Sequence, residues 1–217
     1  MTRDLTPAET RVLGCLVEKE LATPEYYPMT LNALVNACNQ KSNRSPVVVF
    51  DETIVAEALE SLRPLGLAIQ SVEGGRAAKF CHNLYGKYRL QDAEMAVLAE
   101  LLLRGPQTGG ELRQRASRMR PLDSMEQVEE ILTVLMELEE TLVTKLPRQT
   151  GRKESRYAHL LSGEPDLKDV GTTPTTAILN ARAGNERIEN LETEVSELKR
   201  EIAELKATFE LFRQQFE

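Results

Sequence analysis

The chain of 217 residues has no tryptophan, only three cysteines and only two histidines. The cysteines, Cys15, Cys38 and Cys81, are odd in number and form no Cys-x-x-Cys pair. This pattern predicts reduced thiols and excludes both a disulfide framework and a zinc site. No apolar run approaches the roughly 18 residues of a membrane span, and the N-terminus has no signal-peptide pattern. The sequence therefore predicts a soluble, cytoplasmic protein that does not enter a membrane.

The short motifs of common enzyme families are also missing. There is no phosphate-binding GxxxxGK[ST], no GxSxG nucleophile elbow, no HExxH metal motif and no dinucleotide-binding GxGxxG. We therefore expect a non-enzymatic chain with no cofactor and no catalytic or metal-binding residues. The formal net charge of −7 excludes a uniformly basic surface but leaves room for a local basic face.

What the chain does contain is a repeat. Residues 5–9 (LTPAE) return as 90–94 (LQDAE), and the segment from Gly75 to His82 returns as the segment from Gly151 to His159. The order of the matching segments is kept while their spacing drifts by a few residues, as expected of a duplicated domain. Two copies of about 80 residues each are large enough to bury a core without disulfides.

Each copy predicts three helices followed by a β-hairpin. Thr6 with Pro7 and Glu9 is a helix start, Thr30 and Thr108 begin the second helices, and the third helices begin near Asp51 and Ser124. Two extended segments joined by a turn then end at the shared histidine. This order is typical of a winged helix-turn-helix domain. A generic three-helix domain with an unrelated hairpin is the alternative.

Beyond the repeat, apolar residues recur at steps of three and four, which predicts a coiled coil of about four heptads. β-Branched residues at a and leucine at d favour a parallel dimer over the first heptads, and we expect a homodimer. The expected contact residues are Ile188, Leu191, Val195, Leu198, Ile202, Leu205, Phe209 and Phe212.

The predicted fold class is mainly α with small β-hairpins (α+β): two tandem winged helix-turn-helix domains plus a C-terminal coiled-coil helix. The predicted boundaries are 1–87 for the first winged-helix domain, 88–161 for the second, 162–187 for a flexible linker and 188–217 for the coiled coil.

Two segments of the first copy carry a family resemblance. Residues 18–28 (EKELATPEYYP) and 31–44 (LNALVNACNQKSNR) resemble the signature of the YceH-like family of bacterial proteins, and the similarity extends to about residue 161. The resemblance implies two tandem winged-helix domains in a bacterial cytosolic protein. That family has no settled activity, so no site residues follow from it.

Winged helices commonly bind DNA through the third helix, yet both third helices are predicted to be acidic on the outward face. Glu52, Glu57 and Glu60 point outward from the first, and Glu126, Glu129, Glu130 and Glu137 from the second. Phosphates repel such faces. Basic residues lie elsewhere and predict a phosphate-binding strip on helix 2, loops and wings: Lys41, Arg44, Arg113, Arg115, Arg118, Arg120, Lys145, Arg148, Arg152 and Lys153.

Two functions remain open, and analogy with other winged-helix proteins places the first narrowly ahead of the second. The first is a dimeric regulator that associates with double-stranded DNA through this strip. The second is a protein-interaction scaffold that uses the acidic third helices and the loop containing Tyr26 and Tyr27. The two histidines, His82 and His159, are predicted to share a structural role at the end of the wing rather than to bind metal.

Overall fold

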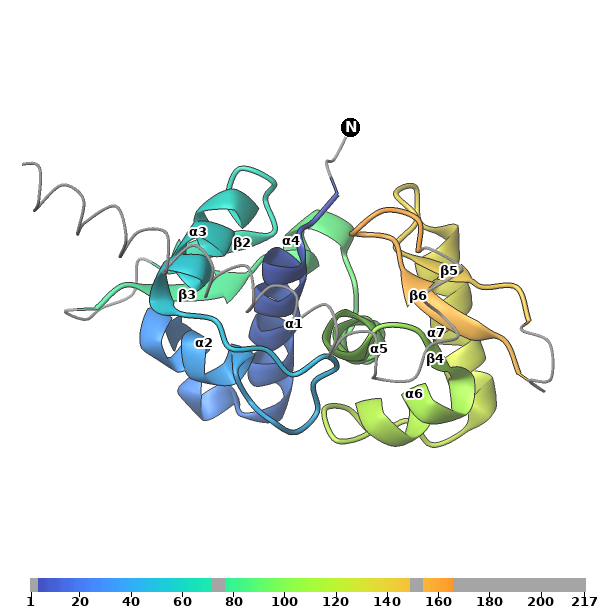
Figure 1. The fold of residues 1–217 in the computed structure, drawn as a ribbon. Coiled ribbons are helices and arrows are strands. Elements are labelled where there is room, and N and C mark those ends of the chain that lie inside the picture. Colours follow the sequence, from blue (N-terminus) through green and yellow to red (C-terminus); the bar gives the residue numbers. More distant parts are fainter. Residues whose placement is uncertain (1–3, 72–76, 149–153, 166–217) are drawn as a thin grey trace, which may run out of the picture. The chain divides into compact units, whose positions relative to one another are not determined.

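The computed structural model describes residues 4–71, 77–148 and 154–165. In the first half of this region (Figure 1) the chain forms three helices and a small sheet. The elements are α1 (Pro7–Ala22), the 3₁₀ turn η1 (Pro24–Tyr26), β1 (Met29–Thr30), α2 (Leu31–Cys38), α3 (Glu52–Leu62), β2 (Ala68–Ser71) and β3 (Lys79–His82). The strands are antiparallel in the order β1-β3-β2.

The second half repeats this arrangement after the short connecting helix α4 (Leu84–Tyr88). Its elements are α5 (Asp92–Arg104), β4 (Gln107–Thr108), α6 (Gly109–Ala116), α7 (Met125–Glu137), β5 (Val143–Lys145) and β6 (Arg156–His159). The strand order β4-β6-β5 is the same as in the first half, and the pairing is again antiparallel. The predicted mixture of helices and small antiparallel sheets is therefore confirmed.

Local signals place the helix starts where the sequence predicted them. Thr6 and Glu9 form a reciprocal capping box at the start of α1, and Thr108 and Glu111 form the equivalent box on α6. Ser124 accepts the backbone N–H of Gln127 at the start of α7. Each cap satisfies a backbone N–H that has no partner within its own helix, so these residues determine where the helix begins.

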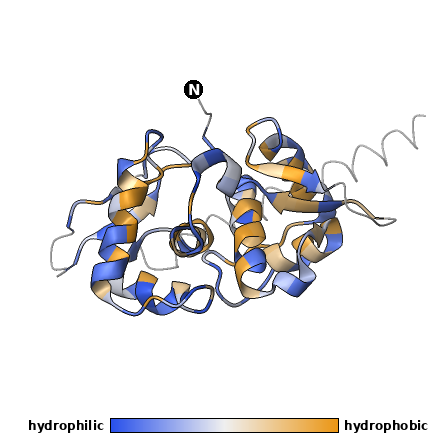
Figure 2. Ribbon diagram, turned by 180° about the vertical axis from the view of Figure 1, so that it is seen from behind, coloured by the Kyte–Doolittle hydropathy of each residue, from blue (hydrophilic) through white to orange (hydrophobic). Residues whose placement is uncertain are grey.

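The first helix of each half is buried on all sides, because α1 and α5 pack against each other as well as against their own halves. Figure 2 shows α5 nearly end-on and predominantly hydrophobic. Gly14 lies at this contact: a Cβ there would be 3.0 Å from the Leu102 Cβ and from the Leu103 side chain. Glycine thus allows the close approach, and the two halves share one continuous apolar core.

Several small elements were not predicted, namely the two-residue strands β1 and β4, the turn η1 and the helix α4. The predicted linker and coiled coil, residues 162–187 and 188–217, lie outside the described residues except for the segment 162–165. The dimer contacts expected there stay a prediction.

Candidate functional site

The outward faces of both third helices are acidic, as predicted. On α3, Glu52, Glu57 and Glu60 are exposed; on α7 the exposed carboxylates are Glu126, Glu129, Glu130 and Glu137. Within the described residues, only Glu60 of these seven forms an ion pair, with Arg63 on the same helix turn. Val134 adds an exposed apolar side chain to the α7 face. The other six carboxylates of these two faces form no ion pair among the described residues.

The basic residues predicted to form a strip have different surroundings. Six are exposed: Lys41, Arg113, Arg118, Arg120, Lys145 and Arg148. Arg152 and Lys153 lie outside the described residues. Four of the ten are ion-paired to carboxylates of this same chain, namely Arg44, Arg115, Arg118 and Arg120. The structure therefore does not bring the predicted residues together as one free cationic surface.

Arg44 departs most from the prediction, because it is 5% exposed and cannot reach a phosphate. Its Nη1 and Nη2 donate to the two oxygens of the buried Glu18 carboxylate at 2.9 and 2.5 Å. The remaining donors reach the Ala37 carbonyl oxygen and the Gln40 side chain. A guanidinium fork matched to a carboxylate in this way is a two-point interaction, stronger than a single neutral hydrogen bond.

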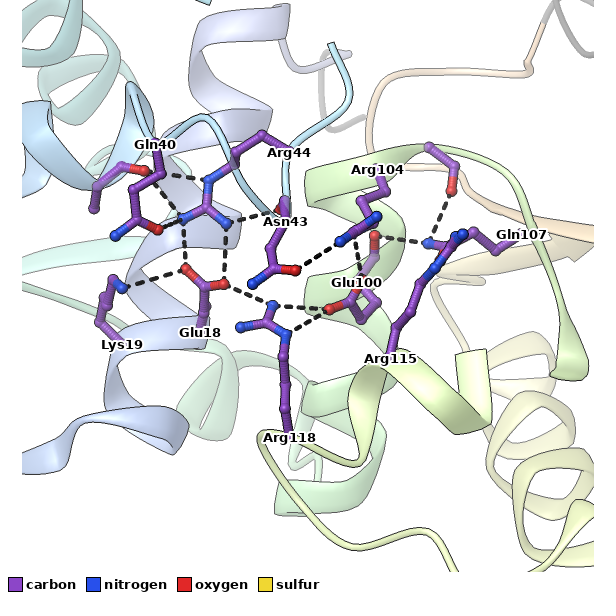
Figure 3. Close-up of polar contacts among 12 residues, drawn as sticks. Glu18, Lys19, Gln40, Asn43, Arg44, Glu100, Arg104, Gln107, Arg115 and Arg118 are labelled. Atoms are coloured by element: carbon purple, nitrogen blue, oxygen red, sulfur yellow. Dashed lines mark hydrogen bonds and ion pairs between the residues drawn. The ribbon is translucent and has the colours of Figure 1, made fainter. Parts of the chain in front are cut away.

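Arg118 extends this pair across the boundary between the halves (Figure 3). Its Nη2 lies 2.6 Å from Glu18 Oε1 on α1 and 2.8 Å from Glu100 Oε1 on α5. Arg104 lies on the other side of Glu100, with its Nη2 donating to Asn43 Oδ1 at 2.7 Å. We call Glu18, Arg44, Glu100, Arg104 and Arg118 the inter-half cluster. It links the loop after α2 to α5 and to the residues following α6.

The cluster holds the Glu18 carboxylate in the charged form. Burial alone raises the pKa of Glu18, but the hydrogen bonds and charge of Arg44, with the charge of Arg118, bring that pKa below its ordinary value. Burial likewise lowers the pKa of Arg44, and its bonds to Glu18 outweigh this and raise the pKa. Each group is thus ionised because the other is present.

Arg115 belongs to a separate set of contacts on the second half. It donates to Gln107 Oε1 at 2.7 Å and lies 3.2 Å from Glu111. Arg156 approaches the same Glu111 and donates to the Pro106 carbonyl oxygen at 2.7 Å. These arginines fix α6 to β6, so their charge is largely balanced inside the domain.

The two histidines occupy matching positions in β3 and β6 but have different partners. His82 is buried; its Nδ1 accepts the Leu84 N–H and its Nε2 faces Glu20. Its backbone N–H donates to the Tyr27 hydroxyl at 2.7 Å. The loop tyrosines thus differ in role, because Tyr27 packs at the wing while Tyr26 is 74% exposed.

At His159 the ring has no equivalent partners. Its Nδ1 is buried and makes no hydrogen bond within the described part of the chain. Burial lowers the pKa of His159 to about 4. The expected structural role, with the ring hydrogen-bonded, therefore fits His82 and does not describe the Nδ1 of His159.

Three further expectations concern metals, thiols and membranes. Among residues 4–71, 77–148 and 154–165 there is no group of three or more histidine, cysteine, aspartate or glutamate side chains able to hold a metal ion. The three cysteines are free, with Cys15 and Cys38 buried. No helix in those ranges has the length and apolar character needed to cross a membrane.

Comparison with known proteins gives a family and relatives along the full length. A family model described as "Protein of unknown function, DUF480" matches residues 5–152. The chain is 60% identical over 215 residues to a UPF0502 protein of Geobacter metallireducens, covering 98% of each chain. It is 56% identical over 219 residues to one from Geotalea uraniireducens, covering 100% of each, and 52% identical over 215 residues to one from Pelobacter propionicus, covering 98% of each. The expectation of a bacterial family without a settled activity agrees with these descriptions.

Proposed function

The chain belongs to the DUF480 family of bacterial proteins, and we propose that it is a non-enzymatic, cytoplasmic protein-interaction module made of two winged-helix domains. Its partner is a protein with a basic surface, bound by the acidic faces of α3 and α7. We also propose that, within this family, the chain is a member of the YceH-like group. The topology supports the winged-helix part: helix, strand, helix, helix, strand, strand occurs twice, each time with the first strand beside the third.

The observation that carries the interaction function is the unbalanced charge of the third helices. When a winged helix binds DNA, its third helix enters the major groove of the DNA. Unpaired carboxylates on that helix would lie close to the DNA phosphates. Repulsion of about 1 kcal/mol per close charge pair applies even in water-like dielectric, so the six carboxylates without an ion pair oppose that mode. A basic protein surface reverses the sign of the same interactions. The buried Arg44 and the paired Arg115 and Arg118 further reduce the cationic surface left for DNA.

This proposal predicts the effect of neutralising the third helices. A variant with Glu57, Glu126 and Glu130 changed to glutamine is expected to bind its protein partner about tenfold more weakly, because exposed ion pairs contribute up to about 1 kcal/mol each. The partner is defined by capture from nuclease-treated lysate and mass spectrometry, and its affinity is then measured with purified proteins.

A matched control removes the same number of negative charges elsewhere. Glu25, Glu154 and Glu164 are exposed and lie outside α3 and α7, so their glutamine variant should keep wild-type affinity. Equal losses in the two variants would contradict a specific role for the third helices. If instead duplex DNA binds the wild type tightly and the third-helix variant poorly, the function is DNA recognition through those helices.

The proposed homodimer has its own test, since its contacts lie outside the described residues. Sedimentation of the full chain is expected to give a dimer, and deletion of the residues from Ile188 onward a monomer. The truncated chain should keep its cooperative unfolding, because the core of the described residues is built without that segment. A monomeric full-length chain would rule out the coiled-coil dimer.

A further inference from the structure

Two buried cysteines meet where α1 packs against the end of α2. Arg11, Cys15 and Glu18 are buried on α1 at steps of four and three residues, so they share one face of the helix. α2 ends at Cys38, whose carbonyl oxygen accepts a hydrogen bond from Arg11 Nη1 at 3.2 Å. This bond places Cys38 beside Cys15, which lies one helical turn after Arg11. Both cysteines are 0% exposed.

Arg11 brings an unbalanced positive charge to this contact. It is 4% exposed, and its Nη1 and Nη2 donate to the carbonyl oxygens of Cys38 and Pro46. Among residues 4–71, 77–148 and 154–165 it forms no ion pair, and its Nε makes no hydrogen bond there. A buried guanidinium is costly unless a neighbouring group balances its charge.

Cys15 is placed to supply the missing negative charge. The Arg44 side chain hydrogen-bonds Cys15 as well as Glu18, and the Cys38 thiol donates a hydrogen bond to the Cys15 sulfur. Burial alone raises the pKa of Cys15, but the Cys38 hydrogen bond and the charges of Arg44 and Arg11 bring that pKa below its ordinary value of 9.0. The same hydrogen bond, together with burial, raises the pKa of Cys38. One cysteine is thus favoured as a thiolate, and its neighbour stays a thiol.

We propose that Cys15 and Cys38 are a redox-sensitive pair that a peroxide converts to a disulfide. The Cys15 thiolate attacks one oxygen of hydrogen peroxide and breaks the O–O bond, and the departing hydroxide takes a proton from solvent, which leaves a sulfenic acid. The Cys38 sulfur then attacks the Cys15 sulfur, and the S–O bond breaks as hydroxide leaves with the Cys38 proton as water. The two sulfurs lose two electrons, which reduce one peroxide to two waters.

Peroxide reaches the pair through local opening of the segment between α2 and α3. Residues 39–51 belong to no helix or strand, and Pro46 of this segment is bound by Arg11 beside the two cysteines. Segments without regular structure open at a smaller free-energy cost than core helices. The pair is separate from the acidic faces of α3 and α7, and its oxidation does not depend on what those faces bind.

Cys81 provides an internal comparison, because exposure and thiolate character predict opposite orders of reactivity. Cys81 lies on β3 and is partly exposed, whereas Cys15 and Cys38 are enclosed. Burial and the charge of Glu20 raise the pKa of Cys81, so its thiol is disfavoured as a nucleophile. A small oxidant should therefore select the buried pair, and a bulky thiol reagent should select Cys81.

The test treats the full chain with hydrogen peroxide at neutral pH, quenches with acid, alkylates the remaining thiols and identifies the peptides by mass spectrometry. A peptide joined through Cys15 and Cys38 is expected to form at least tenfold faster than any oxidation product of Cys81. A bulky maleimide added to the untreated chain should label Cys81 first. Ultraviolet absorbance of the thiolate should show one cysteine titrating below pH 9.0, and Cys15→Ala should remove that step.

Cys81→Ala is the matched control, because it removes a thiol outside the pair and should leave disulfide formation unchanged. Cys38→Ala should stop the reaction at the Cys15 sulfenic acid, which dimedone traps, and thermal unfolding verifies that each variant is folded. If a variant does not fold, the peptide measurement on the wild type decides alone. The proposal is overturned if peroxide oxidises Cys81 first, or if the Cys15–Cys38 disulfide forms only in the urea-unfolded chain.

Discussion

Replacing Arg44 by methionine is expected to lower the free energy of unfolding by about 3–5 kcal/mol, the loss typical of removing one partner from a buried ion pair. The side chains of Arg44 and Glu18 are 0% and 1% exposed. Without Arg44 the Glu18 carboxylate keeps only Arg118 as a close guanidinium partner, and the Ala37 carbonyl oxygen loses its donors. Urea unfolding followed by far-ultraviolet circular dichroism measures the loss.

Arg63→Met is the matched control, because Arg63 makes an exposed ion pair with Glu60 on the same helix. Its expected cost is below about 1 kcal/mol. A double variant that replaces Glu18 by leucine as well as Arg44 by methionine should recover part of the loss, since it leaves no uncompensated charge at the pair. If Arg44→Met costs no more than Arg63→Met, the inter-half cluster does not stabilise the fold.

Acid should weaken the same cluster. The pKa of Glu18 lies below its ordinary value of 4.5 in the folded protein, so the unfolded chain binds the proton more readily. The stability that Glu18 contributes is present above pH 4.5 and is lost as the pH falls through the lowered folded pKa. This places the effect of Glu18 at the acid end of the stability profile.

Much of the fold was predictable because its signals are local. Thr6, Thr108 and Ser124 lie at helix starts for reasons contained in four consecutive residues. The outward carboxylates of α3 and α7 follow from helical periodicity alone. β1 and β4 could not be found in this way, since a two-residue strand contains too few positions to show alternation.

The partners of Arg44 were not predictable for a different reason. Glu18 precedes it by 26 residues and Arg118 follows in the other half, so no local pattern joins them. A polar loop containing Arg44 has the same sequence appearance whether the guanidinium reaches solvent or enters the core. The sequence repeat likewise predicted where the two histidines lie but not what surrounds them. His82 and His159 occupy equivalent positions in β3 and β6, but only His82 has Tyr27 beside it, because Tyr27 lies in a loop that only the first half possesses.

The His159 ring lacks the partners of the His82 ring. We therefore expect His159 to cause the largest change of folding stability with pH above pH 4. Burial lowers the pKa of His159 to about 4 from an ordinary value of 6.5, so between these values the unfolded chain binds a proton that the folded chain excludes. Stability is full above pH 6.5 and falls as the pH decreases toward 4. The loss is roughly 3 kcal/mol, at about 1.4 kcal/mol for each pH unit between the two pKa values.

Replacing His159 by leucine should therefore flatten the unfolding free energy between pH 6.5 and pH 4, the interval set by the two pKa values. Leucine fills a similar volume without a titrating nitrogen, and the buried Nδ1 that it removes has no hydrogen bond among the described residues. His82→Leu should act differently and lower stability already at pH 8, because the Leu84 N–H loses its acceptor. Urea titrations at half-unit pH steps separate the two behaviours. A His159→Leu profile with the wild-type slope would show that the folded protein admits the proton at His159, through water or a local opening that relieves the burial.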